Sequence, residues 1–347
     1  MMLVSMLAAV PLAGAVEVTW VGGGHASNPQ WSPDGNWVAF EVNNNADKVD
    51  LYVVKVQNGN PSQPQKIVIP GGSSSFSAMG SYVANPNWHP KGPVIFEGAN
   101  SGGKTRLYYL MPGGSSPAEY LSIAQAPGSL SWPAISQDGA YLAFTSDASG
   151  HGDIYQFATA ANKVTNTFPS DLPENAPRYS PDGKTLVFSR KNQGTEDLFT
   201  WVQGTSAQAP LKGGNGDQSR PRYAVTDVVY FTNERGDDHW DVAVIPAAGG
   251  ERRIVAKDIR LPLRSQPSLT PLKDAVVYGS ASPNQDSKVF VTKLSDGTTK
   301  EINTGLTAVG DPVICQANGR TFLAFTALPT SGSDWRQLHV VDVTGQI

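Results

Sequence analysis

The sequence predicts an all-β protein, a seven-bladed β-propeller built of four-stranded antiparallel blades. Three observations support this prediction: a unit that recurs about every 45 residues, three strand-like segments in every unit, and many turns, with 35 glycines and 26 prolines among 347 residues. No segment shows helical periodicity over a useful length. The formal net charge of −4 leaves no basic footprint for a nucleic-acid partner.

The first element of each unit contains a proline followed one residue later by a bulky side chain. Proline has no N–H to donate, so this segment suits a strand that lacks a ladder partner at that point, as the innermost strand of a blade would. Turns with the sequence Ser-Pro-Asp-Gly, as at 32–35 and 180–183, then lead to the second strand. The seven motifs lie at 28–31, 85–88, 132–135, 176–179, 220–223, 266–269 and 311–314.

The second element is an apolar triplet that ends in an aromatic residue. Continuous runs of β-forming residues suit a strand that is packed on both faces. These triplets lie at 38–40, 94–96, 142–144, 186–188, 228–230, 276–278 and 323–325. A third strand follows each triplet, at 50–52, 106–108, 153–155, 197–199, 241–243, 288–290 and 337–339, and six units add a short fourth segment, as at 66–69, 119–122 and 252–255.

The seventh unit ends near Val343 without a fourth strand, whereas residues 17–21 form a strand-like segment without the other three. We expect residues 17–21 to complete the last blade and close the ring, because closure removes the open sheet edge between the first and last blades. Residues 16–347 then form a single domain, and no residues remain for a separate catalytic one.

Residues 1–12 are almost wholly apolar, and the small residues 13–15 follow them. This pattern predicts a signal peptide over residues 1–15, although no Lys or Arg precedes Lys48. The alternatives are a buried N-terminal strand or a cloning artefact. An apolar stretch of about 12 residues is too short to span a bilayer as a helix, and no later segment approaches the required length. We therefore expect an exported monomer without a transmembrane span.

The unit resembles the WD40-like propeller repeat of TolB-like proteins. The best matches, at 28–56, 132–157 and 176–201, combine the proline motif, an aliphatic-Ala-Phe or similar triplet and an Asp-(Leu/Ile)-aromatic segment. The resemblance covers essentially all of 16–347 and implies a bacterial, periplasmic or secreted scaffold that binds an envelope protein or peptide. TolB itself carries an α/β domain and six blades, and this sequence shows neither.

The same type of repeat also builds polysaccharide lyases and the propellers of serine peptidases. A lyase or hydrolase that acts on a carbohydrate is therefore the alternative function. However, no G-x-S-x-G motif occurs, and we expect Cys315, the single cysteine, to be a small buried hydrophobe.

A metal site would require side chains from different blades. The five histidines, His25, His89, His151, His239 and His339, are not spaced as ligands on one element. The acidic residues Glu234, Asp237, Asp238 and Asp241 form either a hard-cation site or a solvated hairpin. We expect neither a metal nor another cofactor.

The candidate binding residues lie in segments that we expect to meet at the mouth of the central channel. The long connection at 70–84 contains Phe76, Met79 and Tyr82, which either bind a peptide or sugar or fold down as a plug. His151 and His239 lie in hairpins on the same rim. The residues beside the inner-strand prolines complete the set: Asn28, Asn85, Arg178, Arg222 and Asp311.

Arg178 and Arg222 occupy equivalent positions in adjacent units. Two converging guanidinium groups could hold a carboxylate of a ligand in bidentate fashion. Alternatively, each arginine pairs with Glu174 or Asp217 and only fastens the blades together.

Overall fold

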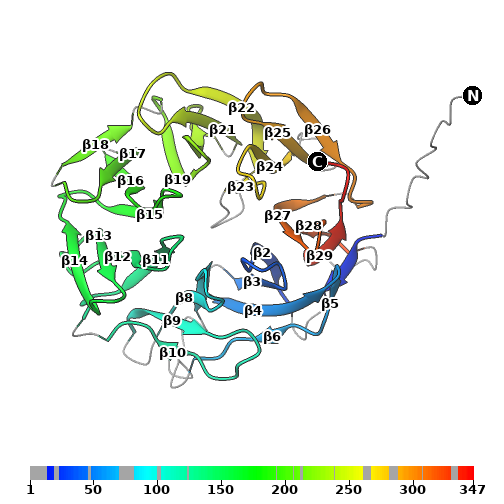
Figure 1. The fold of residues 1–347 in the computed structure, drawn as a ribbon, viewed down its shortest axis with the longest axis horizontal. Helices are drawn as coiled ribbons and strands as arrows, with labels where there is room; N and C mark the ends of the chain where they lie inside the picture. Colours follow the sequence, from blue (N-terminus) through cyan, green and yellow to red (C-terminus); the bar gives the residue numbers. More distant parts are fainter. Residues whose placement is uncertain are drawn as a thin grey trace, which may run out of the picture.

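The predicted fold is confirmed: seven antiparallel sheets of four strands each, one with an additional short strand, are arranged in a ring around a common axis (Figure 1). The computed structural model describes residues 14–18, 23–45, 48–69, 82–99, 103–122, 125–192, 194–205, 207–211, 214–237, 239–260, 267–280, 288–306, 308–329 and 335–347. No helix occurs among these residues.

The first four blades follow one another along the chain. They are β2 (His25–Trp31), β3 (Trp37–Asn45) and β4 (Lys48–Gln57) with β5 (Asn60–Pro61) and β6 (Gln65–Lys66); β7 (Val83–Trp88), β8 (Val94–Ala99), β9 (Thr105–Leu110) and β10 (Ala118–Glu119); β11 (Leu130–Ile135), β12 (Tyr141–Ser146), β13 (Asp153–Ala158) and β14 (Lys163–Phe168); β15 (Glu174–Tyr179), β16 (Thr185–Asn192), β17 (Thr195–Val202) and β18 (Gln208–Leu211).

The remaining three blades include the one that closes the ring. They are β19 (Asp217–Tyr223), β20 (Asp227–Asn233), β21 (His239–Pro246) and β22 (Arg253–Arg260); β23 (Ser268–Leu269), β24 (Ala275–Ser280), β25 (Lys288–Lys293) and β26 (Thr299–Ile302); β27 (Gly310–Ala317), β28 (Arg320–Ala327), β29 (Gln337–Asp342) and β1 (Val16–Val18).

The ring closes as predicted, through the N-terminal strand. β1 pairs antiparallel with β29, with Val16 opposite Val340 and Val18 opposite Leu338. The predicted boundary of 17–21 differs from the observed one, because β1 begins at Val16 and residues 19–22 lie outside the described part of the chain. Val18 is buried against the seam between the last and first blades.

Each blade is held by a buried second strand, as the apolar triplets predict. In six blades the aromatic residue of the triplet stacks on a ring from the third strand, with centroids 5.6–6.2 Å apart. Such pairs stabilise a core beyond the burial of their area. The six pairs are Phe40–Tyr52, Phe96–Tyr108, Phe144–Tyr155, Phe188–Phe199, Tyr278–Phe290 and Phe325–His339.

The predicted Ser-Pro-Asp-Gly turns are also present. At 32–35 the Gly35 N–H donates to the Ser32 carbonyl at 2.9 Å, and Gly35 has a left-handed φ of 69°. The Ser32 hydroxyl donates to Asp34 Oδ1 at 2.5 Å and accepts the Trp37 N–H at 2.9 Å. The same arrangement recurs at 180–183 and, with Gln replacing Pro, at 136–139.

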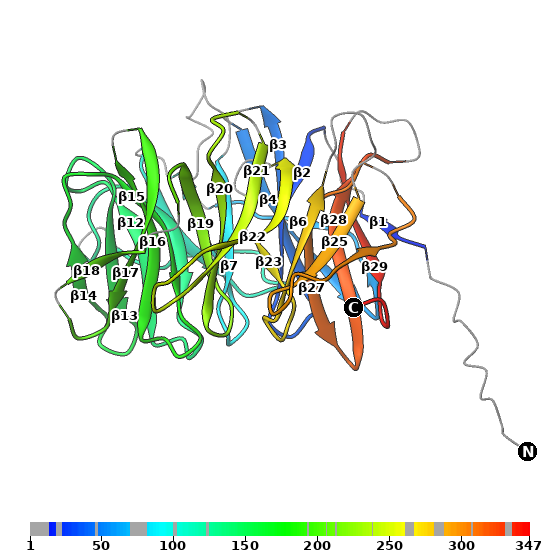
Figure 2. The same ribbon diagram turned by 90° about the horizontal axis from the view of Figure 1, so that it is seen from above.

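The antiparallel order gives the disc two distinct faces (Figure 2). The first strand of every blade starts on the face that also carries the hairpin between the second and third strands. It ends on the opposite face, at the turn that leads to the second strand. We call these the loop face and the turn face.

Candidate functional site

The inner strands share a strained conformation at the residue that precedes proline. Register shifts interrupt the ladder at this point in the six blades where the motif is described. A left-handed φ is costly for a residue with a Cβ, and the sequence did not predict it. The six residues have φ values of 47–54°: Asn28, Asn85, Trp132, Ala176, Arg220 and Asp311.

Three carboxylates accept the N–H groups that the bulges release, each from the neighbouring blade. Asp311 Oδ2 accepts the Asn28 N–H at 3.4 Å, and Glu41 Oε1 accepts the Asn85 N–H at 2.8 Å. Glu97 Oε2 accepts the Trp132 N–H at 2.9 Å. We call Asp311, Glu41 and Glu97 the carboxylate chain, because they link the seventh, first, second and third blades in sequence.

Side-chain amides complete this network. Asn28 Nδ2 donates to Glu41 Oε1 at 2.9 Å, and Asn85 Nδ2 donates to Glu97 Oε1 at 2.7 Å. Tyr82, one of the predicted loop residues, also donates its hydroxyl to Glu97 Oε1. The sequence reasoning missed Glu41 and Glu97, although a signal existed: each acid directly follows the phenylalanine of a buried triplet, where a charge needs a specific reason.

Two buried acceptor oxygens in the network have no hydrogen-bond partner among the described residues. They are Asn85 Oδ1 and Asp311 Oδ1. An ionised carboxylate can only accept hydrogen bonds, so Asn85 must direct its Nδ2 donor toward Glu97. Asn85 Oδ1 then points away from Glu97 and has no donor among the described residues. Burial raises the pKa of Asp311 to about 7, with a further increase from Glu41. Near neutral pH the Asp311 carboxyl is therefore a mixture of protonated and ionised forms.

Arg178 and Arg222 lie two residues further along their strands than the strained positions, toward the turn face. Arg178 is only 8% exposed. Arg178 Nη1 donates to the Pro177 carbonyl at 2.6 Å, and Arg222 Nη1 donates to the Pro267 carbonyl at 3.4 Å. Burial lowers the pKa of Arg222 to about 10, and burial together with Arg222 lowers the pKa of Arg178 to about 9.

The alternative in which Glu174 and Asp217 fasten these arginines is wrong. Glu174 instead pairs with Arg190, whose Nε donates to Glu174 Oε1 at 2.9 Å. The two residues are directly opposite each other in the ladder of β15 and β16. Asp217 Oδ1 accepts the Glu196 N–H at 2.8 Å.

Of the predicted rim residues, Tyr82 joins this network, whereas His151 and His239 do not. Phe76 and Met79 lie outside the described residues. His151 lines a surface groove of about 640 Å³ together with Asp153, Ser170 and Arg190. His239 lies on the hairpin of the fifth blade, two blades away.

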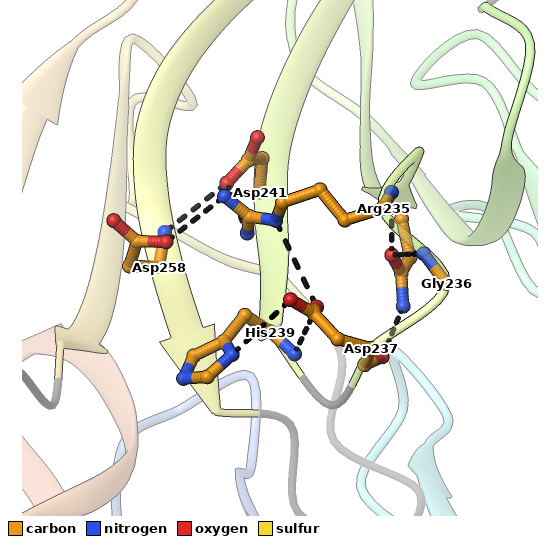
Figure 3. Close-up of polar contacts among 7 residues, drawn as sticks. Arg235, Gly236, Asp237, His239, Asp241 and Asp258 are labelled. Carbon is orange, nitrogen blue, oxygen red and sulfur yellow. Dashed lines mark hydrogen bonds and ion pairs between the residues drawn. The ribbon is translucent and has the colours of Figure 1, made fainter. Parts of the chain in front are cut away.

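Arg235 pairs with acidic residues of that hairpin and of the following strand, β22 (Figure 3). Arg235 forms ion pairs with Asp241 at 3.2 Å, Asp258 at 3.0 Å and Asp237 at 3.7 Å. Asp237 also lies 3.5 Å from His239 Nδ1. These pairs favour a solvated polar hairpin over a cation site, and Asp238 lies outside the described residues.

The histidines do not fit the centre of a metal-dependent lyase within the described residues. His25 packs edge-on against Trp335, and His89 Nδ1 accepts the Lys91 N–H. His339 takes the place of an aromatic residue in its blade, and burial lowers its pKa to about 4. In the described ranges no group of three or more His, Cys, Asp or Glu could hold a metal ion.

Cys315 does not provide a nucleophile. The residue is buried and free, and burial raises the pKa of its thiol to about 12. The thiolate, which is the reactive form, is therefore scarce at neutral pH.

Comparison with known proteins shows likeness of fold. No family model matches the chain. A curated relative, the uncharacterized peptidase YuxL of Bacillus subtilis strain 168, is 24% identical over 188 residues, which are 52% of this chain. The chain spans only 24% of the length of that relative.

Among the described residues, no helix is long and apolar enough to cross a membrane.

Two solved structures resemble the propeller over most of this chain. TolB from Acinetobacter baumannii has a TM-score of 0.58 and 18% identity, with 81% of this chain and 66% of TolB covered. An oligogalacturonate lyase from Vibrio parahaemolyticus has a TM-score of 0.63 and 10% identity, with 95% and 94% covered. The architecture is thus that of TolB and related propeller proteins.

Proposed function

We propose that this chain is a non-catalytic binding scaffold whose loop face binds a bacterial envelope protein or peptide. The observation that carries the proposal is the pair of buried oxygens without partners, Asn85 Oδ1 and Asp311 Oδ1. They occupy equivalent positions in the second and seventh blades, on either side of Asn28. Buried acceptors normally have a donor, and a bound segment with N–H or ammonium groups would supply one.

The rim of the same face offers further contacts. His151 and His239 lie on its hairpins, and Tyr82 directly precedes the inner strand of the second blade. We infer that Phe76 and Met79, which lie outside the described residues, contribute to the same surface. Aromatic side chains near polar anchors are typical of surfaces that bind proteins. The TolB-like architecture supports this type of function.

Asp311→Asn tests the proposal with little change of shape. Asparagine keeps one oxygen to accept the Asn28 N–H, but it places an NH₂ group where the second acceptor was. We expect a captured envelope partner to bind the variant about tenfold more weakly or worse, because a buried donor would then meet a donor. Asp296→Asn, on the turn face, is the matched control. Equal binding by wild type and Asp311→Asn contradicts the proposed site.

Export completes the proposed function. We infer that residues 1–15 are a signal peptide and that residues 16–347 are a monomeric, single-domain mature protein in the periplasm or medium. Cell fractionation and mass spectrometry of the mature N-terminus test the first statement. Light scattering of the purified chain tests the second, and a dimer would contradict it.

A carbohydrate lyase is the second candidate. The structural match with the oligogalacturonate lyase covers 95% of this chain and 94% of that enzyme. The test is incubation of the purified chain with oligogalacturonate and a series of divalent cations. The unsaturated product of such a lyase absorbs ultraviolet light. Its appearance would overturn the non-catalytic function, whereas captured partner binding without product would support it.

A further inference from the structure

A groove on the turn face lies between the fourth and fifth blades, which are adjacent in the ring (Figure 1). It has a volume of about 480 Å³, which suits a small molecule. Val202 and Val225 line it and are 49% and 65% exposed, so burial of these side chains by a ligand would be favourable. The other apolar residues of the lining are Pro181, Ala247 and Ala248.

Tyr223 also lines the groove, and its hydroxyl group has no hydrogen-bond partner within the described ranges. The residue is only 7% exposed. Burial raises the pKa of Tyr223 well above its usual value of 10, and the charge of Asp182 raises it further, so the hydroxyl keeps its proton. A buried hydroxyl without a partner costs free energy, and a ligand that bonds it would recover that cost.

The equivalent position in three other blades holds a ring whose polar atom has a partner. Trp31 Nε1 and Trp88 Nε1 each donate to a carbonyl oxygen of the preceding blade, at 3.1 and 2.9 Å. In the fourth blade, the Tyr179 hydroxyl accepts a hydrogen bond from Gln156 Nε2 of the third blade at 3.1 Å. Tyr223 therefore differs because of the side chains that the fourth blade presents to it.

Two small side chains in the fourth blade replace larger ones in the third. By their places in the repeat and in the ladder, Thr200 corresponds to Gln156, and Thr185 corresponds to Tyr141. Gln156 lies opposite Ala143, two residues after Tyr141, so Gln156 and Tyr141 share the face that is turned toward the fourth blade. Both threonines line the groove. The groove thus corresponds to a place where the preceding junction has an amide group and an aromatic ring.

We propose that the groove binds a small neutral ligand that carries an aromatic ring and an amide group. The ring would lie beside Thr185 against the apolar lining, and the amide carbonyl would accept a hydrogen bond from the Tyr223 hydroxyl. A carboxylate is disfavoured, because the carboxyl group of Asp182 also lines the groove. The site is on the face opposite the proposed partner-binding face, so either function can exist without the other.

Benzamide is the probe, and ligand-observed NMR and thermal unfolding of the full chain are the measurements. We expect saturable binding with a dissociation constant of about 1 mM or lower, as for a fragment of this size, and a higher melting temperature. Sodium benzoate at the same ionic strength should bind about tenfold more weakly, because Asp182 repels its charge. The absence of saturable benzamide binding, or equal binding of benzoate, overturns the proposal.

Tyr223→Phe and Tyr179→Phe form a matched pair. Tyr223→Phe should weaken benzamide binding about fivefold to tenfold without lowering the melting temperature, because it removes only a hydroxyl that has no partner. Tyr179→Phe removes the acceptor of Gln156, so it should lower the melting temperature and leave benzamide binding unchanged. Unchanged binding in Tyr223→Phe, or an equal loss of binding in both variants, contradicts the site.

Thr200→Gln tests the origin of the groove. The new amide would stand where Gln156 stands in the third blade and bond the Tyr223 hydroxyl. We expect a higher melting temperature and the loss of benzamide binding, because the side chain then occupies the place of the ligand's amide. Thr195→Gln, at the exposed start of the same strand, should leave binding unchanged. Benzamide binding by Thr200→Gln that equals wild type overturns the proposal.

Discussion

The two sides of the propeller axis treat buried charge in opposite ways. On the seventh, first and second blades, the carboxylate chain receives N–H groups from the strained residues of the next blade. On the fourth to sixth blades, Arg178 and Arg222 donate to carbonyl oxygens of Pro177 and Pro267, and like charges face one another.

The difference has a simple physical origin. A bulge at a residue before proline releases one backbone N–H from the ladder, and an N–H can satisfy an anion but not a cation. Negative charge at the axis therefore becomes part of the structure, as in the links from Glu41 to Asn85 and from Glu97 to Trp132. Positive charge near the axis instead donates to backbone carbonyl oxygens, as Arg178 does to Pro177 and Arg222 does to Pro267.

The largest expected effect tests the structural role of the carboxylate chain. Glu97→Ala leaves three donors, from Tyr82, Asn85 and Trp132, without their acceptor. We expect a loss of about 3–5 kcal/mol in the free energy of unfolding, measured with urea. Glu301→Ala, which removes an exposed ion pair with Lys288, should cost less than about 1 kcal/mol. Similar losses in both variants would show that the chain is not structural.

Removal of the closing strand should affect the side of the propeller that carries the carboxylate chain more than the other side. Deletion of residues 16–21 exposes the apolar seam at Val18, and we expect a loss of about 2–3 kcal/mol. The seam adjoins the link from Asp311 to Asn28, whereas Arg178 and Arg222 lie on other blades. Scanning calorimetry should therefore show a lower melting temperature. Unchanged thermal stability would contradict closure by this strand.

A pH dependence isolates Asp311. Its folded pKa is about 7, above the usual 3.8. Between these values the folded protein keeps the proton and the unfolded chain loses it, so unfolding free energy falls as pH rises and levels off above pH 7.

Asp311→Asn should lack this component. Between about pH 5 and pH 7.5, wild type should lose about 2 kcal/mol more than the variant in urea unfolding. Glu174, with a pKa of about 7, and His339, with a pKa of about 4, titrate in both proteins and cancel in the difference. Parallel profiles would show that Asp311 ionises normally.

In the smallest expected effect, two substitutions change the free energy of unfolding in opposite directions. Lys273→Gln removes a charge beside Arg222 and should stabilise the protein by about 0.5 kcal/mol. Lys66→Gln loses an ion pair with Asp50 at 2.8 Å and should destabilise it by a similar amount. Destabilisation by both substitutions would remove the contrast between paired and unpaired cations.

The sequence predicted the fold because every blade of a propeller repeats the same local sequence signals. Proline marks the interruption of each inner strand, the apolar triplet marks the buried second strand, and Ser-Pro-Asp-Gly specifies the turn between them. Even the replacement of an aromatic by His339 could be located by its place in the repeat, and it stacks on Phe325 at 5.6 Å.

The sites were harder to predict, because their partners come from other strands or from other blades. Glu174 and Arg178 are four residues apart in the sequence, but four residues of a strand span roughly 13 Å. The ladder register instead places Arg190 opposite Glu174. The N–H groups that Glu41 and Glu97 accept belong to the next repeat, so the sequence of one repeat does not show these pairs.

By itself, the sequence determined the number of blades, the order of their strands and the closing segment, since these depend on periodicity and local turn chemistry. Only the tertiary structure decided which side chains meet at the axis. The left-handed backbone before each described proline interrupts the ladder within a blade, and the N–H groups that it releases pair with carboxylates of the neighbouring blade. Contacts between repeats depend on their relative placement, which no single repeat encodes.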